Sequence, residues 1–548
     1  MFAQCPGGRL QPGGGVASAR VMHHMKHSRQ LSVSLRPASA TNMFPLRRLC
    51  PVLLLLAGAS LSCDPGPPAS SMDITGIVCR FTEEAALIFN QETSDVIQTT
   101  LRHASFPDMA GEKSILILGT VSYVLKNLQI MNMSVESSNV ELSNEKGILV
   151  SIQNVAATIK GTMDYAYTNW LLLLNHSLDF EVESQTDVDL ALTLACDNGR
   201  IEVIISDCLL NFDKLSLQLQ KLSKISWIKQ LLTDFVSFTL RHVLKGQICA
   251  EIRKMANLLS DFTLKQAGIF IQDGEISTST ELIGDPVITS GYVESRHKGS
   301  VFYKNLSVFQ KPSVIPVERE EIRMFNVWVS EPVINSLLFA AYHEDRLTLK
   351  LKDNDLLKVF EDGEFENEPN ILQQIFPAVP MNELILKLTP LRPPSVLFRR
   401  IGTILEGSLS VEFDVLPDGK ESHTALYLEM DIETTVQSSY ANRKIQLWPS
   451  SNRWSIKAIK HNLTITLDEN KANYYLENFF SSGGLQNIMS YVEFYITALL
   501  DKKGLHYFNV TNTVLEPSKG YVIIATDFHF PRQLLENFLR NLTSTTKS

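Results

Sequence analysis

The chain has 548 residues, of which 44% are hydrophobic and 20% are charged, and its formal net charge is −9. This length exceeds what one hydrophobic core usually supports, so we expect two or more domains. The mildly acidic balance argues against nucleic acid or lipopolysaccharide as the dominant partner, because binding such polyanions requires a strongly basic surface.

The N-terminus combines a signal-like stretch with a preceding segment of different composition. In the stretch 43–63, Arg47 and Arg48 precede an apolar core that is too short to span a bilayer, and small residues permit cleavage after Ser62. We therefore predict a signal peptide at 43–62 and a secreted, extracellular protein. Residues 1–42 contain no Asp or Glu. We interpret them as an upstream extension of doubtful status, and a transit peptide stays open as the alternative.

The first half of the mature chain begins with a predicted helix over 81–104. Thr82 is a suitable N-cap for it, with acidic residues behind. Residues 227–252 predict a long helix whose charged side chains exclude a simple membrane span. Between these helices, alternating apolar and polar residues predict strands with one solvated face, over 115–130 and 140–167.

The second half repeats this order after a segment with prolines and a cluster of charges, 308–321, which we interpret as a linker. A capped helix is predicted over 330–347, with Pro332 in its first turn, and a long helix over 474–504. Alternating stretches between them predict strands, over 346–353, 383–390, 407–416, 424–436 and 453–469.

The chain closes on FPRQLLENFLRNL (530–542), which predicts an amphipathic helix with Pro531 in its first turn. A helix this short is not stable alone in water, so its apolar face must lie against another part of the protein. That face comprises Leu534, Leu535, Phe538, Leu539 and Leu542.

The repeated order predicts an α+β fold of two pseudo-symmetric barrels, each a highly twisted antiparallel sheet wrapped on a long helix. Such a barrel has a large apolar interior between helix and sheet. The expected domains are an N-terminal barrel at 63–307, the linker, a C-terminal barrel at 322–529, and the C-terminal helix with its tail at 530–548.

Motifs for catalysis or metal binding are missing from the sequence. There is no G-x-S-x-G, H-E-x-x-H or Walker pattern and no spaced Cys/His set, and Asp353-Asn354-Asp355 lacks the glycine and glutamate of a calcium loop. The stretch SSGG (481–484) predicts a helix break, with a phosphate cradle as the alternative. We expect no enzyme, no metal and no cofactor, although a triad assembled in space stays open.

Cleavage after Ser62 leaves an odd number of cysteines, namely Cys63, Cys79, Cys196, Cys208 and Cys249. In an oxidising compartment this implies at least one unpaired thiol or an intermolecular bond. We interpret Cys79, on an early strand, as a buried small hydrophobe. Sequons predict a glycoprotein, with acceptors at Asn132, Asn175, Asn305, Asn462, Asn509 and Asn541.

Short stretches between about residues 72 and 542 resemble, in their order and spacing, the family of bactericidal/permeability-increasing protein and plasma lipid transfer proteins. The similarity is strongest to the members that transfer cholesteryl esters. The stretches are TGIVCR (75–80), FPDMAGEK (106–113), VSIQNV (150–155), WIKQL (227–231), VLKGQIC (243–249), GDPVIT (284–289), YKN-x-S (303–307), ETTVQSSY (433–440) and DF-x-FP (527–531).

The resemblance implies an elongated boomerang of two barrels joined by a central β-sheet, with one structural disulfide between Cys208 and Cys249. It implies a monomeric plasma protein that moves cholesteryl esters and triglycerides, and phospholipid, between high-density and low- or very-low-density lipoproteins through an apolar tunnel. Phospholipid transfer or lipopolysaccharide binding on the same fold is the alternative, and a secreted lipase or acyltransferase is a further one.

The resemblance also implies lipid-binding residues. Ser295 and His297 match family positions near the middle of the tunnel, although such residues are often simply hydrogen-bonded core groups. Leu264 and Gln266 match positions where the family has polar and basic side chains. The apolar positions of a lid helix that covers the N-terminal tunnel mouth are matched by Leu535, Phe538 and Leu539. An ordinary docked terminal helix is the alternative.

Overall fold

The computed structural model describes residues 63, 75–101, 108–115, 119–168, 173–219, 226–304, 306–308, 315, 323–360, 371–417, 421–461, 474, 476–479 and 484–545. The predicted upstream extension and signal peptide, most of the predicted linker, and the sequons at Asn305 and Asn462 lie outside these residues. The same holds for most of SSGG, of which only Gly484 is described.

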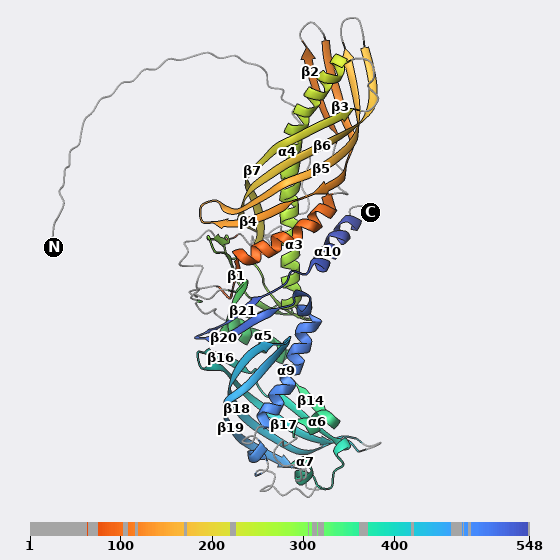
Figure 1. Ribbon diagram of the computed structural model, residues 1–548. Coiled ribbons are helices and arrows are strands. Elements are labelled where there is room, and N and C mark those ends of the chain that lie inside the picture. Colours follow the sequence, from red (N-terminus) through yellow and green to blue (C-terminus); the bar gives the residue numbers. More distant parts are fainter. Residues whose placement is uncertain are drawn as a thin grey trace, which may run out of the picture. The chain divides into compact units, whose positions relative to one another are not determined.

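The first half consists of a curled antiparallel sheet and two helices (Figure 1). Helix α3 (Glu83–Leu101) begins directly after Thr82, whose Oγ1 accepts a hydrogen bond from the Ala85 amide at 3.4 Å, so the predicted N-cap is confirmed. The N-terminal sheet has the strand order β2-β3-β5-β6-β7, with β4 paired to β5. Its strands are β2 (Met109–Ile115), β3 (Gly119–Ser134), β4 (Ser137–Ser143), β5 (Gly147–Thr168), β6 (Leu173–Asp197) and β7 (Arg200–Leu219).

Helix α4 (Ser226–Ile271) runs along this sheet (Figure 1). Leu240 and Leu244 of α4 share one buried core with Phe180 and Val182 of β6. The helix continues 19 residues beyond the predicted end at 252, so the predicted boundary was wrong. Within the described residues, no helix is both long and apolar enough to cross a membrane.

The second half repeats the strand order of the first. Its C-terminal sheet has the order β14-β15-β17-β18-β19, and β16 pairs with β17 just as β4 pairs with β5. Helices α5 (Glu331–His343) and α9 (Gly484–Lys502) flank the sheet in sequence, as α3 and α4 do in the first half. The predicted repeat is therefore confirmed. The strands are β14 (Leu349–Lys352), β15 (Leu384–Pro390), β16 (Ser395–Arg399), β17 (Gly402–Val415), β18 (His423–Ala441) and β19 (Lys444–His461).

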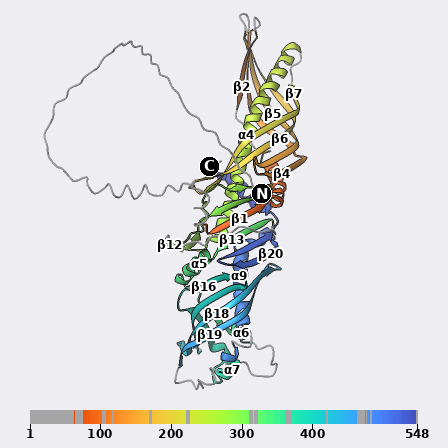
Figure 2. The same cartoon turned by 90° about the vertical axis from the view of Figure 1, so that its left-hand side faces the viewer.

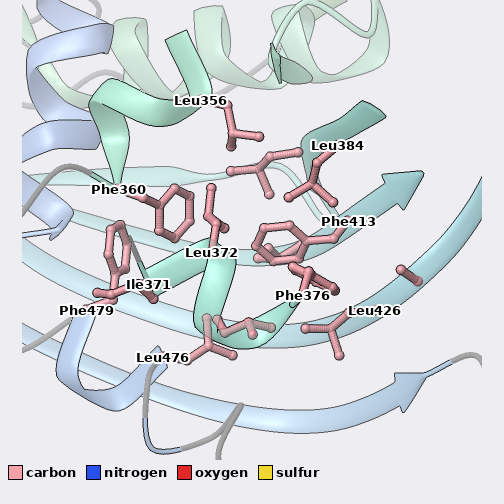
Figure 3. Packing of buried hydrophobic residues seen from close by; sticks show 14 of the residues in the cluster. Leu356, Phe360, Ile371, Leu372, Phe376, Leu384, Phe413, Leu426, Leu476 and Phe479 are labelled. Atoms are coloured by element: carbon pink, nitrogen blue, oxygen red, sulfur yellow. The ribbon is translucent and has the colours of Figure 1, made fainter. Parts of the chain in front are cut away.

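Aliphatic side chains and four phenylalanines form the main core of the second half (Figure 3). Phe360 stacks on Phe479 with ring centroids 4.4 Å apart, and Phe376 lies 5.2 Å from Phe413 of β17. The short helices α6 (Asp353–Val359) and α7 (Ile371–Ile375) contribute further buried side chains to this core. Asp353-Asn354-Asp355 begins α6 and thus lies in a helix rather than in a calcium-binding loop.

A central sheet combines strands from both halves (Figure 2). Its order is β20-β21-β13-β1-β10-β9, and all of its pairings are antiparallel. A Cβ atom at Gly76, which precedes β1, would lie 2.3 Å from the Lys298 carbonyl oxygen, so this close approach requires glycine. The strands are β1 (Ile77–Thr82), β9 (Val287–Ile288), β10 (Tyr292–His297), β13 (Phe325–Ser330), β20 (Thr511–Ser518) and β21 (Tyr521–Asp527).

Smaller elements complete the described chain. A separate sheet has the order β12-β11-β8, and short 3-10 helices, η2 and η3, precede β15 and β20. The terminal helix α10 follows β21. The bounds of these elements are β8 (Ile276–Thr278), β11 (Val301–Tyr303), β12 (Leu306–Val308), η2 (Met381–Glu383), η3 (Leu505–Phe508) and α10 (Arg532–Thr545).

Two disulfides are present among the described residues. Cys208 of β7 is bonded to Cys249 of α4. Cys63 is bonded to Cys196 at the end of β6, so the expectation of a single structural disulfide was wrong. Because the odd number of cysteines leaves the pairing open, the sequence contained no signal for this second bond. Within the described residues, Cys79 of β1 is the free cysteine.

The described sequons differ in their surroundings. Asn132, Asn175 and Asn541 are exposed. Asn509 is half-buried, and its Oδ1 accepts a hydrogen bond from Arg443 at 3.0 Å while its Nδ2 lies 3.3 Å from His529 Nδ1. A glycan replaces one of the two Nδ2 hydrogens, so attachment at Asn509 leaves the hydrogen bond from Arg443 to Oδ1 possible but needs room beside His529.

Candidate functional site

One face of the central sheet is largely buried, and we call it the closed face. It carries Val78 and Arg80 of β1, Glu294 of β10, Trp328 of β13 and Ile523 of β21, all of them buried. Arg80 and Glu294 form an ion pair of 2.8 Å, and the Arg80 guanidinium lies 3.8 Å from the centre of the Tyr292 ring. Ile315, from the predicted linker, packs against the apolar side chains of this face.

The opposite face is mostly apolar, and we call it the open face. Strand alternation and register bring together on it the side chains of four adjacent strands. Most of them are half-buried, while their neighbours on the closed face are buried. The open face comprises Ile77, Cys79, Phe81, Val293, Ser295, His297, Phe325, Val327, Val329, Val522, Ile524 and Thr526.

Helix α5 covers one end of the open face, where Ile77 and Val329 pack near Val333 and Ala340. Away from this end, Phe81 makes edge-on contact with Phe325 at 6.1 Å and lies 5.9 Å from Phe528. Half-exposed apolar side chains gathered on one sheet face are typical of a wall that binds an apolar ligand. We therefore take the open face as the candidate binding surface.

Ser295 and His297 bring polar groups to this surface. Ser295 Oγ lies 2.9 Å from His297 Nε2, and His297 Nδ1 lies 2.7 Å from the Thr280 carbonyl oxygen. Because a carbonyl oxygen only accepts, Nδ1 carries the proton, and the Ser295 hydroxyl donates to Nε2. Burial lowers the pKa of His297 from its ordinary value, while the bond to Thr280 opposes the shift. The imidazole is therefore neutral at pH 7.

Cys79 lies directly opposite Ser295 in the register of β1 and β10. Burial raises the pKa of the Cys79 thiol to about 12. Because the thiolate is the nucleophilic form, this thiol is unreactive at neutral pH. The interpretation of Cys79 as a small buried hydrophobe on an early strand agrees with these features.

The C-terminal helix α10 docks its apolar face on the first half of the chain (Figure 1). Leu535 is 0% exposed and Leu539 is 6% exposed, and both pack with Met255 and Phe262 of α4. Phe538 lies against the same cluster, 5.5 Å from the Phe262 ring. The predicted amphipathic helix is confirmed, and its apolar face contacts the part of α4 that the predicted boundary left out.

Two contacts hold the start of α10 near α3. Phe530 lies between two rings, 5.0 Å from Phe89 of α3 and 6.0 Å from Phe262 of α4. Arg532 donates to Glu92 of α3 through Nε at 3.0 Å and Nη2 at 2.9 Å. Our sequence reasoning missed these contacts, because residues 440 positions apart give no local signal.

Leu264 and Gln266 lie on the last turns of α4, and both are half-buried. Two residues of helix turn a side chain by about 200°, so Leu264 lies on the side of α4 away from Phe262. Gln266 is one turn beyond Phe262, on the same side as the docked α10. The structure thus places these two residues on α4, whereas Ser295 and His297 lie on β10.

Two surface hollows, of about 450 Å³ and about 200 Å³, are lined largely by polar side chains. Neither includes a residue of the open face or of the α10 contact. Their polar walls do not suit an apolar ligand, so the open face remains the candidate site.

The amino-acid sequence matches models of a known protein family. The sequence model of the LBP / BPI / CETP family, N-terminal domain, matches residues 87–262, and the model of its C-terminal domain matches residues 271–530. The chain is 38% identical over 490 residues to the cholesteryl ester transfer protein of Gallus gallus, covering 89% of this chain and 97% of that protein.

Two further relatives agree with this placement. The chain is 38% identical over 493 residues to the cholesteryl ester transfer protein of Homo sapiens, covering 89% of this chain and 98% of that protein. It is 22% identical over 332 residues to the bactericidal permeability-increasing protein of Rattus norvegicus, covering 60% and 66% of the two chains. The chain therefore belongs to the LBP / BPI / CETP family.

Proposed function

We propose that this protein transfers cholesteryl esters between lipoprotein particles, with triglycerides and phospholipid as further cargo. The observation that carries the proposal is the 38% identity to cholesteryl ester transfer proteins over nearly the whole length of both chains. The open face supports it, because it offers a continuous apolar wall bearing a hydroxyl group.

Transfer needs no covalent chemistry. Each buried CH₂ group is worth about 0.8 kcal/mol, so a long acyl chain alone loses on the order of 10 kcal/mol when it enters water. A protein that holds the ester against an apolar wall lowers this barrier. The Ser295 hydroxyl lies on that wall, within the span of the sheet that joins the two halves, and it donates to an ester carbonyl when its proton turns away from His297 Nε2.

Helix α10 acts in this proposal as a lid that docks reversibly. Its contacts with α3 and α4 are few enough for local release without global unfolding. Leu535, Phe538 and Leu539 form the docking face, and the ion pair between Arg532 and Glu92 orients the start of the helix. Gln266, on the side of α4 where α10 docks, and Leu264, on the opposite side of α4, are proposed to line the path of the lipid.

We further propose that the protein is secreted into plasma, is glycosylated and acts as a monomer on high-density and low- or very-low-density lipoproteins. The predicted signal peptide and the sequons support this setting. No metal or cofactor enters the proposed mechanism.

Ester hydrolysis is the second candidate function, and one observation favours it. The 2.9 Å distance between Ser295 Oγ and His297 Nε2 is that of a nucleophile and its general base. Against it, the group that accepts from His297 Nδ1 is the Thr280 carbonyl rather than a carboxylate that would stabilise an imidazolium.

A transfer assay separates these functions. Donor high-density particles carry labelled cholesteryl ester, triglyceride or phosphatidylcholine, and unlabelled low-density particles are the acceptors. We expect the purified protein to move intact ester to the acceptors without release of fatty acid. Movement of phosphatidylcholine alone would identify a phospholipid transfer protein, and release of fatty acid that stops with a serine-directed inhibitor would identify a hydrolase. Tight binding of endotoxin without transfer would favour a lipopolysaccharide-binding protein.

A further inference from the structure

The side chains of the open face form rows that run across the central sheet. One row, which we call the middle row, comprises Ser295 of β10, Cys79 of β1, Val327 of β13 and Ile524 of β21, each directly opposite the next in register. Neighbouring strands lie about 4.8 Å apart, so the middle row spans about 14 Å. Its members are half-buried, and none of them is larger than isoleucine. The middle row is therefore a narrow, mostly apolar strip that begins at a hydroxyl group.

On one side of the middle row, the sheet is covered by the protein itself. The adjoining row contains His297, Ile77 and Val329. Ile77 and Val329 pack in one cluster with Val333 and Ala340 of α5, and His297 is 8% exposed. A ligand that meets the Ser295 hydroxyl must therefore extend along the middle row or toward its other side.

The other side of the middle row carries phenylalanines. Phe81 lies two residues beyond Cys79 on β1, which is about 7 Å along the strand, and is directly opposite Phe325 of β13. These two rings meet edge-on with their centroids 6.1 Å apart, and the Phe528 ring lies 5.9 Å from the Phe81 ring at a tilt of 44°. All three side chains are half-buried. We call Phe81, Phe325 and Phe528 the phenylalanine wall.

The two parts of a sterol ester differ in shape, as the middle row and the phenylalanine wall do. The sterol has rigid fused rings joined directly to the ester oxygen, whereas the acyl chain is narrow and flexible. When the ester carbonyl accepts a hydrogen bond from Ser295, the rings must lie close beside this residue. Aromatic side chains offer a large, stiff apolar surface because they have few rotatable bonds. The wall therefore suits the rings, and the middle row suits the chain.

We propose that the phenylalanine wall binds the sterol rings of a cholesteryl ester, while the acyl chain follows the middle row from Ser295 toward Ile524. The three phenylalanines are then specificity-determining residues. A triglyceride has only flexible chains and no rings, so it gains less than a sterol from a stiff aromatic surface. The inference rests on the proposed function and adds to it the orientation of the cargo and the residues that select it.

Photo-labelling of the full-length protein tests this orientation. Two cholesteryl ester probes carry a diazirine, one within the sterol rings and the other in the middle of the acyl chain. Each probe is loaded from lipid particles, and the labelled residues are mapped by mass spectrometry after illumination. We expect the ring probe to label the phenylalanine wall and the chain probe to label Val327 or Ile524.

The possible results separate the orientation from the proposed function. Reversed labelling, equal labelling of the wall by both probes, or ring labels confined to residues outside the wall would overturn the orientation and leave lipid transfer standing. Uptake of neither probe would refute the proposed function, and the orientation with it.

Matched variants measure the selectivity of the wall. The double variant Phe81→Leu, Phe325→Leu keeps the surface apolar but removes two rings, and its ratio of cholesteryl ester transfer to triglyceride transfer should fall several-fold. Phe81→Tyr keeps the ring and should keep the ratio. Phe339→Leu is the control, because Phe339 of α5 is 36% exposed, has its ring 4.3 Å from that of His343 and belongs to no row of the open face. An unchanged ratio in the double variant would contradict the proposal.

Discussion

Ser295 and His297 place a hydroxyl and an imidazole on an otherwise mostly apolar face. We predict that the double variant Ser295→Ala, His297→Ala transfers cholesteryl ester several-fold more slowly, because a neutral hydrogen bond to the ester contributes about 0.5–1.5 kcal/mol. Secretion should change little. The particle-to-particle transfer assay measures the effect, and Ser295→Thr, which keeps the hydroxyl on a β-branched side chain, is the control. Equal rates in the double variant would remove both residues from the proposed site.

The buried imidazole of His297 links stability to pH. Its pKa in the folded protein lies below the ordinary value of 6.5, so between these two pKa values the unfolded chain binds a proton that the folded chain does not. The contribution of His297 to the free energy of unfolding is therefore fully present above pH 6.5. It is lost as the pH falls through the lower pKa that His297 has in the folded protein. We predict that the melting temperature of His297→Gln falls less between pH 7.5 and pH 5.5 than that of the natural protein. An identical fall in both would show that His297 is not the group responsible.

At the scale of the element, α10 depends on the pairing of Arg532 with Glu92. The two side chains are 42% and 38% exposed, so their attraction is worth only about 0.2–1 kcal/mol. We predict that Arg532→Glu, which sets like charges against each other, speeds hydrogen exchange of residues 532–545. The charge-swapped double variant Arg532→Glu, Glu92→Arg should restore protection.

Arg540 supplies the matched control for this experiment. It is 77% exposed and pairs with Glu536 within α10 at 3.5 Å, so Arg540→Gln should leave the docking of α10 nearly unchanged. If the charge swap fails to restore protection, Arg532 acts through contacts other than Glu92.

The disulfide between Cys208 and Cys249 joins β7 to α4 across a sequence separation of 41 residues. Loop-closure entropy predicts that the double variant Cys208→Ala, Cys249→Ala loses about 3–4 kcal/mol of stability. Denaturant unfolding of the secreted protein measures this loss. A loss well below 1 kcal/mol would show that the unfolded chain is already restricted in this loop.

The sequence predicted those helices that are determined by residues close together in the chain. The cap at Thr82 and the apolar stripe of α10 were found because a helix places residues three and four apart on one face. The end of α4 was missed, since the residues beyond 252 are held by packing against α10, and Met255 and Phe262 give no sign of their distant partners. Contacts between segments far apart in the chain decide such boundaries.

At the scale of the molecule, the repeat was predictable because each half carries its own alternation of helices and strands. The central sheet was expected only by resemblance to the family. Its register, which places Cys79 opposite Ser295, depends on pairing between strands more than 200 residues apart. The disulfide between Cys63 and Cys196 could not be predicted either, because the number of cysteines does not show which of them are bonded to each other.

The central claim is that α10 controls the passage of neutral lipid to an apolar surface of the protein. Transfer of labelled cholesteryl ester between high-density and low-density particles, measured for the full chain and for a variant that lacks residues 532–548, tests it most directly. We expect the full chain to transfer intact ester and the deletion variant to lose most of this activity while the protein is still secreted and folded. Undiminished ester transfer by the deletion variant would contradict it and would leave α10 as a stabilising terminal helix.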